Sequence, residues 1–228
     1  MKVVIKITGK VFDEGNEGVI KELSEVVRDR VAAGDRVAVV VGGGRTARVY
    51  MGLGSALGVS KGWLDVFGIE ASRLNALMFA SLLDNLAYTP VPRSVEEFLK
   101  AWSSGKVVVM GGLQPGQSTN AVAAMVAELV EADLFVNATN VDGVYDRDPN
   151  KYSGANLLRR ISPKDLERLV LQEFLPGRYE LIDPIALKLI SRSRIRTVFV
   201  NAFKPSMVRE VLRGNKDVGT WIEYSLNL

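Results

Sequence analysis

The sequence predicts an α/β protein with a mostly parallel central sheet, and two patterns carry this prediction. Five short apolar runs rich in valine and isoleucine alternate with longer segments of helical periodicity. Alternation of strands and helices is typical of βαβ units, whose strands lie parallel. The chain has 228 residues, 47% hydrophobic and 24% charged, which is enough to bury a full core as one domain over residues 1–228.

The strands are expected where valine and isoleucine are densest. Runs of this kind, four to eight residues long and bounded by charged or glycine residues, favour strands over helices. In chain order the predicted strands are Lys2 to Ile7, Arg36 to Val41, Lys106 to Met110, Leu134 to Ala138 and Thr197 to Val200.

Helix starts are marked between these strands. Ser94 with Glu97, and Ser162 with Asp165, have the spacing of a capping box. Proline suits the first turn of a helix, and three prolines occur where such a turn is expected, Pro163, Pro184 and Pro205.

The composition excludes several kinds of chemistry. Cysteine and histidine are both absent, which removes disulfides, thiolate sites, imidazole triads and any histidine base. The formal net charge of +3 is only mildly basic and is spread along the chain, so we expect no nucleic-acid partner. No apolar run reaches the length of a membrane span, and the start of the chain lacks the pattern of a signal peptide. We therefore expect a cytoplasmic protein without a membrane partner.

Glycine-bearing turns that follow strands are the places where such a sheet binds ligands. In the stretch KITGK, Lys6 to Lys10, Gly9 permits close backbone approach and two lysines bracket the strand end. A solvated charge at a strand end explains the lysines equally well. In VVVGGGRTAR, Gly42 to Gly44 precede a helix opened by Arg45 and Arg48, an arrangement that favours phosphate. A tight strand-to-helix turn is the alternative for these glycines.

A third turn almost spells a nucleotide-binding signature. The stretch VVVMGGLQPGQST, Val107 to Thr119, has the glycine spacing of a P-loop, but Gln117 stands in place of the phosphate-binding lysine. Ser118 or Thr119 is expected to cap a helix from Asn120 to Leu129. A phosphate cradle without its own cation either takes positive charge from elsewhere in the chain or binds something other than the triphosphate of ATP.

A fourth segment, ATNVDGVYDRDP from Ala138 to Pro149, follows the next strand. It opens a polar loop predicted from Asn140 to Asn156. Asp142 with Gly143 suits a hairpin turn, and the aspartates lack the spacing of an EF-hand loop.

Taken together, these four segments resemble one family. Their order and spacing, K-I-T-G-K, then G-G-G-R-x-A-R, then G-G-x-Q-P-G-Q-S-T, then A-T-N-V-D-G-V-Y-x-x-D-P, resemble the archaeal uridylate (UMP) kinases of the amino acid kinase superfamily. The resemblance covers nearly the whole chain. It implies a three-layer αβα sandwich and the ATP-dependent conversion of UMP to UDP in pyrimidine nucleotide biosynthesis.

The resemblance also implies a role for each motif residue. The catalytic residues would be Lys6, Lys10 and Arg48, with Lys6 at the transferring phosphoryl group. The ATP-binding residues would be Gly9, Lys10, Gly44, Arg48, Thr139, Asn140, Tyr145 and Asp148. The UMP-binding residues would be Gly43, Asp65, Gln114, Pro115, Gly116, Gln117, Ser118 and Thr119. The loop that lacks a lysine would therefore bind the acceptor phosphate.

The chemistry of phosphoryl transfer agrees with this composition. The reaction depends on positioning, charge neutralisation and Mg²⁺. A monophosphate has a second pKa of about 6, so its attacking oxygen is largely deprotonated at neutral pH and needs no base. Asn140 stands where some relatives have a lysine-organising aspartate, and no residue is assigned to Mg²⁺, which phosphate oxygens and water can hold. Asp183, which precedes a proline, either faces the transfer region or caps a helix.

Other functions share parts of this pattern. A superfamily kinase acting on a carboxylate, such as acetylglutamate, also needs no base, and a non-catalytic nucleotide sensor would keep the fold. An isopentenyl phosphate kinase is disfavoured because that branch relies on a histidine. The resemblance further implies a homohexamer inhibited by UTP. The apolar helical stretch from Leu64 to Leu86 is then either a subunit interface or core.

Overall fold

The computed structural model describes residues 1–149, 151–173 and 181–224. A seven-stranded sheet has the order β3-β2-β1-β4-β8-β9-β7. Every neighbouring pair is parallel except β8 with β9. In chain order its strands are β1 (Lys2–Ile7), β2 (Arg36–Val41), β3 (Val108–Met110), β4 (Leu134–Thr139), β7 (Arg160–Ile161), β8 (Thr197–Asn201) and β9 (Thr220–Ile222).

Helices connect these strands, and a small hairpin stands apart from the sheet. The hairpin pairs β5 (Val144–Tyr145) with β6 (Leu157–Leu158) in antiparallel fashion. The helices are η1 (Gly9–Phe12), α1 (Glu17–Ala32), α2 (Gly44–Ala56), α3 (Lys61–Leu83), η2 (Asp84–Leu86), α4 (Val95–Ser103), α5 (Thr119–Leu129), α6 (Pro163–Glu173), α7 (Pro184–Ser193) and α8 (Pro205–Leu212).

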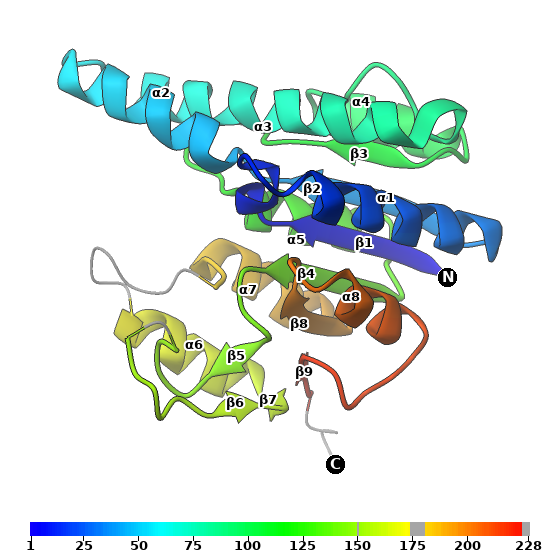
Figure 1. Cartoon of the computed structure of the whole chain (residues 1–228), viewed down its shortest axis with the longest axis vertical. Coiled ribbons are helices and arrows are strands. Elements are labelled where there is room, and N and C mark those ends of the chain that lie inside the picture. The colour runs from blue at the N-terminus through cyan, green and yellow to red at the C-terminus, as the bar shows by residue number, and fades with distance from the viewer. Residues whose placement is uncertain (150, 174–180, 225–228) are drawn as a thin grey trace.

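The molecule has three layers because successive side chains of each strand point to opposite faces of the sheet. Val4 belongs to a core cluster shared with α4, α5, α6 and α7, whereas its neighbour Ile5 belongs to a second cluster shared with α1, α3 and α8. Figure 1 shows α1 and α8 on the near side of the strands and α5 and α7 on the far side. The predicted αβα sandwich with a mostly parallel sheet is confirmed.

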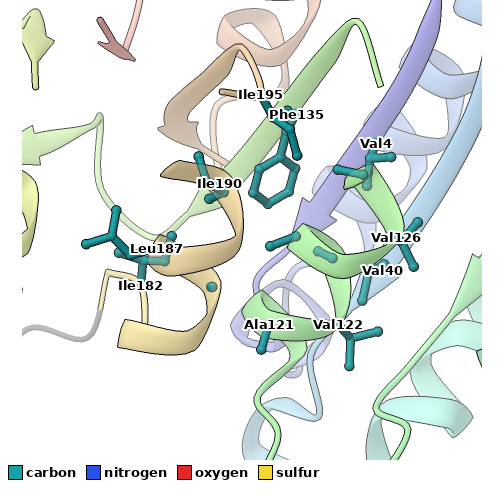
Figure 2. Close-up of a cluster of buried hydrophobic side chains, with 14 of the residues drawn as sticks. Val4, Val40, Ala121, Val122, Val126, Phe135, Ile182, Leu187, Ile190 and Ile195 are labelled. Carbon is teal, nitrogen blue, oxygen red and sulfur yellow. The ribbon is translucent and has the colours of Figure 1, made fainter. Parts of the chain in front are cut away.

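The far layer is built on two helices packed side by side. Figure 2 shows α5 and α7 next to each other, with Ile190 of α7 beside Phe135 of β4 in a cluster that also contains Val4 and Val40. Glu128, in the last turn of α5, accepts hydrogen bonds from the Arg192 side chain of α7 at 2.8 and 2.5 Å.

The predicted elements match the structure closely. The first two strands have the predicted bounds, the third begins at Val108, and the fourth and fifth each gain one residue. All three prolines open a helix, and the hydroxyls of Ser94 and Ser162 accept the expected backbone hydrogen bonds. The polar loop predicted from Asn140 to Asn156 is wrong in part, because β5 lies inside it. Asp142 and Gly143 precede that strand and do not form the turn of the hairpin.

The long apolar helix α3 has two faces. Ala76, Phe79 and Leu83 are buried against the sheet. A stripe on its outer side, which we call the outer stripe of α3, is exposed and consists of Leu74, Leu77, Met78 and Leu82. The segment Lys61–Leu86 is long and apolar enough to cross a membrane by length and composition, but 44% of its most apolar window is buried inside the fold. The stretch from Leu64 to Leu86 therefore contributes to the core and also presents an apolar surface.

Candidate active site

The four motif segments lie at one edge of the sheet. The strands β3, β2, β1 and β4 are neighbours and run parallel, so the segments that follow them leave from the same edge. Their order along this edge is the GGLQPGQST loop, the GGGR loop, the TGK turn and the ATN loop. Strands lie about 4.8 Å apart, so the two outermost loops leave the sheet about 15 Å from each other.

Lys6 lies in the middle of this edge, on β1. Its side chain is only 8% exposed, so a solvated charge at the strand end is not the explanation of this lysine. Lys6 is paired in register with Asn137 of β4, and both residues point to the face covered by α5 and α7. Asn137 is fully buried, and its side-chain oxygen has no hydrogen-bond partner among the residues that the structure describes.

The TGK turn and the GGGR loop touch through their backbones. A Cβ on Gly9 would lie 2.1 Å from the nitrogen of Gly44, and Gly44 itself has a φ of +61°. Only glycine fits such a contact at both positions. Gly43 is the N-cap of α2 and supplies no side-chain cap. The glycines therefore form a tight strand-to-helix turn whose N–H groups also open a helix. Lys10, just beyond the contact, is exposed.

Arg48 points back to the segment after the TGK turn. Its guanidinium pairs with the Asp13 carboxylate at 3.1 Å, and the other oxygen of Asp13 accepts the backbone N–H of Arg45 at 2.6 Å. The sequence analysis did not identify Asp13, because nothing in its local pattern distinguishes it from other surface acids.

The GGLQPGQST loop is tied to α3 and to α5. The N–H of Gly116 donates to the Asp65 carboxylate at 2.8 Å, and Gly116 has a φ of +76°. Ser118 is the N-cap of α5 and accepts the N–H of Ala121 at 3.0 Å, so Ser118 and not Thr119 fills the predicted cap. Gln114 and Pro115 are exposed, whereas Gln117 and Thr119 are half-buried. Thr119 lies beside the second loop, because a Cβ on Gly42 would be 3.6 Å from its hydroxyl.

Polar side chains on α3 form hydrogen bonds to the backbones of the same loops. Ser72 accepts the N–H of Gly112 at 2.7 Å, and Asn75 donates to the carbonyl of Gly42 at 2.8 Å. Arg73 donates to the carbonyls of Gly112 and Leu113, each at 3.2 Å. We call Ser72, Arg73 and Asn75 the polar row of α3. The sequence analysis missed them, although a signal was present: polar residues interrupt an otherwise apolar helix.

The predicted site residues of the ATN loop differ in how deeply they are buried. Thr139 is buried at the end of β4, and its hydroxyl bonds to the backbone of Val141. Asn140 follows it and is half-buried. Tyr145 lies on the hairpin strand β5, where burial and the Asp142 charge raise its pKa. Asp148 lies in the loop beyond, and its carbonyl accepts the N–H groups of the third and fourth residues after it.

Asp183 caps a helix. One carboxylate oxygen accepts the N–H groups of Ile185 and Ala186 at 3.0 Å each, which makes it the N-cap of α7. Its other oxygen accepts the hydroxyl of Ser118. The capping interpretation of Asp183 is therefore correct, and the same side chain also joins α7 to the start of α5.

One cavity lies away from these loops. Its volume is about 880 Å³, and it lies between α6, β7 and the end of the described chain, with Arg160, Asp165 and Glu223 in its wall. None of the predicted site residues lines it. A smaller cavity of about 330 Å³ lies beside Asp13 and Arg45.

Known proteins resemble this chain over nearly its full length. The model of the Amino acid kinase family matches residues 1–201. A protein named uridylate kinase from Sulfolobus acidocaldarius is 45% identical over 96% of this chain and 98% of its own, and one from Sulfurisphaera tokodaii is 45% identical over 98% and 99%. The crystal structure of uridylate kinase from Archaeoglobus fulgidus superposes with a TM-score of 0.88 at 38% identity, covering 98% of this chain and all of that one.

Proposed function

This chain belongs to the amino acid kinase family, and from that premise we propose that it is a uridylate kinase, which transfers the γ-phosphoryl group of ATP to UMP and yields ADP and UDP. The relatives named above support the acceptor, and no observation favours a carboxylate acceptor or a non-catalytic sensor instead. The assignment of UMP and ATP to particular loops rests on the order of these loops along the edge of the sheet.

The two substrates are assigned to opposite ends of this row of loops. UMP binds at the loop after β3, with Gly43, Asp65 and the residues from Gln114 to Thr119. ATP binds at the β1 and β4 side, with Gly9, Lys10, Gly44, Arg48, Thr139, Asn140, Tyr145 and Asp148. Lys6 lies on β1, between the two ends of this row of loops, and this position supports its assignment to the transferring phosphoryl group.

The reaction needs charge compensation and alignment more than it needs a base. A UMP phosphate oxygen attacks the γ-phosphorus, the bond from that phosphorus to the bridging oxygen breaks, and its electron pair leaves with ADP. Lys6 stabilises the negative charge that develops on the transferring group, while Lys10 and Arg48 hold the donor phosphates. The glycine N–H groups at the start of α2 add a positive helix end to the same site.

Magnesium enters with ATP. Among the described residues no group of three or more acidic side chains gathers in a way that could hold a metal ion. Asp142, which lies within the ATN loop, is paired with Lys204 at 2.8 Å. A site without such a group among the described residues fits a Mg²⁺ ion that is bound through phosphate oxygens and water, which is common for this ion. The ion would neutralise phosphate charge when bound.

Assembly and regulation belong to the same proposal. The outer stripe of α3 offers four exposed apolar side chains that a second copy of the chain would cover, which supports a homo-oligomer and, by family resemblance, a homohexamer. UTP is proposed to inhibit by competing with UMP. We propose a cytoplasmic location and one domain over residues 1–228.

A panel of acceptors tests this function. ADP release is measured with ATP and Mg²⁺ in the presence of UMP, CMP, AMP, acetylglutamate or glutamate. We expect rapid turnover with UMP and much slower turnover with the other nucleotides. Turnover of a carboxylate without any turnover of UMP would contradict the proposal.

A further inference from the structure

Asp13 joins the two loops to which the donor phosphates are assigned. It follows η1 directly, so it lies on the segment that leaves the TGK turn. One of its oxygens accepts the backbone N–H of Arg45 at 2.6 Å, and the other accepts the guanidinium of Arg48 at 3.1 Å. Both partners are in the first turns of α2, on the far side of the contact between Gly9 and Gly44.

The segment that carries Asp13 is itself held in place. The side chain of Asn16 donates to the carbonyl of Lys10 at 3.2 Å and to the carbonyl of Asp13 at 3.1 Å. The N–H of Asp13 donates to the carbonyl of Lys10 at 3.3 Å. The carboxylate therefore extends from an ordered backbone and fixes the position of its partners.

Arg48 depends on such a partner. Its side chain is 56% exposed, whereas that of Asp13 is 24% exposed. An exposed arginine samples many rotamers, and a fixed carboxylate restricts it to one of them. The helix also depends on Asp13, because its N-cap is a glycine with no side-chain cap and the Asp13 carboxylate takes up one of the N–H groups left unbonded in the first turn.

We propose that Asp13 is a positioning residue for phosphoryl transfer: it holds the first turn of α2 and the Arg48 guanidinium where they meet the phosphates of the donor nucleotide. This inference rests on the donor site assigned under the proposed function. It also predicts whether nucleotide affinity rises or falls when the charge of Asp13 is removed. An acidic group beside a polyphosphate repels it, so a carboxylate without a positioning role would improve nucleotide binding when neutralised. A positioning carboxylate has the opposite effect.

The experiment measures the dissociation constant of a β,γ-imido analogue of ATP with Mg²⁺ by calorimetry, and the KM for ATP. Asp13→Asn keeps the shape of the side chain and an oxygen for the Arg45 N–H but removes the charge paired with Arg48. We expect both constants to rise about tenfold, as for loss of one charge-assisted hydrogen bond. Glu14→Gln makes the same change of charge at the exposed neighbouring residue, and it should leave both constants unchanged or slightly lower.

A double-mutant comparison separates positioning from general stability. In an Arg48→Ala background, Asp13→Asn should change the dissociation constant by less than about twofold, because the group it positions is gone. An unchanged or lower constant in Asp13→Asn alone, or an undiminished tenfold effect in the Arg48→Ala background, would overturn the proposal. The binding readout needs no acceptor, so wild-type protein that binds the analogue but fails to phosphorylate UMP would contradict the proposed function and leave the Asp13 comparison decisive.

Discussion

Lys6 is the residue on which the proposed chemistry depends most. It is a buried lysine at the centre of this edge of the sheet, and we propose that it stabilises charge in the transition state. We expect Lys6→Ala to lower kcat by about 10²-fold or more, as for loss of one preorganised donor. Lys2→Ala is the matched control, since Lys2 lies on the same strand at its other end and is part-exposed. Steady-state kinetics distinguish the roles, because a raised KM for ATP with nearly normal kcat would reassign Lys6 to substrate binding.

A substitution at Gly116 tests which of the two substrates the GGLQPGQST loop binds. Among the described residues, no atom outside the adjacent residues lies within 4 Å of a Cβ built at this position, so a side chain would project into open space. The φ of +76° also disfavours any residue with a Cβ. Gly116→Val should raise KM for UMP strongly and leave KM for ATP nearly unchanged. Gly105→Val is the control, with a φ of +78° and equally open surroundings on a turn beyond α4. A selective loss of ATP affinity would mean that the two substrates are assigned in reverse.

At the scale of elements, α3 supports the GGLQPGQST loop, to which we assign the acceptor phosphate and which we call the acceptor loop. Arg73 bonds two of the loop's carbonyls, so Arg73→Met should raise KM for UMP about tenfold and lower the unfolding free energy by about 1–2 kcal/mol. Arg28→Met removes a comparable bond, from Arg28 to the carbonyl of Leu82 at 2.6 Å, away from the site. Thermal melts and UMP saturation curves are compared for both variants. Equal changes in KM for UMP would show that the effect is not local to the loop.

The pair of helices α5 and α7 is clamped at both ends. Ser118 bonds Asp183 at their starts, and Glu128 bonds Arg192 at their ends. Hydrogen bonds from Arg192 and Ser193 hold the pKa of Glu128 below its ordinary value of 4.5. A lowered folded-state pKa means that this stabilisation is complete above pH 4.5 and is lost as the pH falls through the folded-state pKa.

Melting temperatures measured between pH 7 and pH 3 test the clamp. Glu128→Gln should melt below the wild type at pH 7, and the difference should shrink as the pH falls below about 4.5. The same substitution at the exposed Glu22 should leave the melting curve nearly unchanged at every pH. A difference that stays constant across the range would exclude a charge-dependent clamp.

The sequence analysis succeeded for elements that a local pattern specifies and failed for elements that form through contacts with distant segments. The first two strands were predicted with their full bounds because dense runs of valine and isoleucine identify them locally. The strands β7 and β9 have two and three residues and exist through pairing with distant segments, so no local pattern marks them. Asp13 was missed for the same reason. Its partners in α2 lie more than 30 residues away in the chain.

At the scale of the whole molecule, α3 carries both the exposed stripe proposed for assembly and the side chains that hold the GGLQPGQST loop. The outer stripe of α3 faces away from the sheet, while the polar row of α3 and Asp65 hold the loops on the other side. If copies associate through this stripe, Leu77→Asp should shift the assembly to a smaller species in light scattering, because a charge would be buried in an apolar contact. Glu70→Gln, on the same helix but outside the stripe, should not. A monomeric wild type would contradict the assembly proposal.

If copies associate through α3, the enzymatic activity should depend on protein concentration. Contacts that order α3 between subunits would order the acceptor loop as well, so association and UMP binding become thermodynamically linked, and each strengthens the other by the same factor. Dilution should then weaken the apparent affinity for UMP while sparing that for ATP, and UMP should in turn slow dissociation of the assembly. A long apolar helix that looks in the sequence like a simple packing element would thereby relate the population of the oligomer to the occupancy of one substrate site.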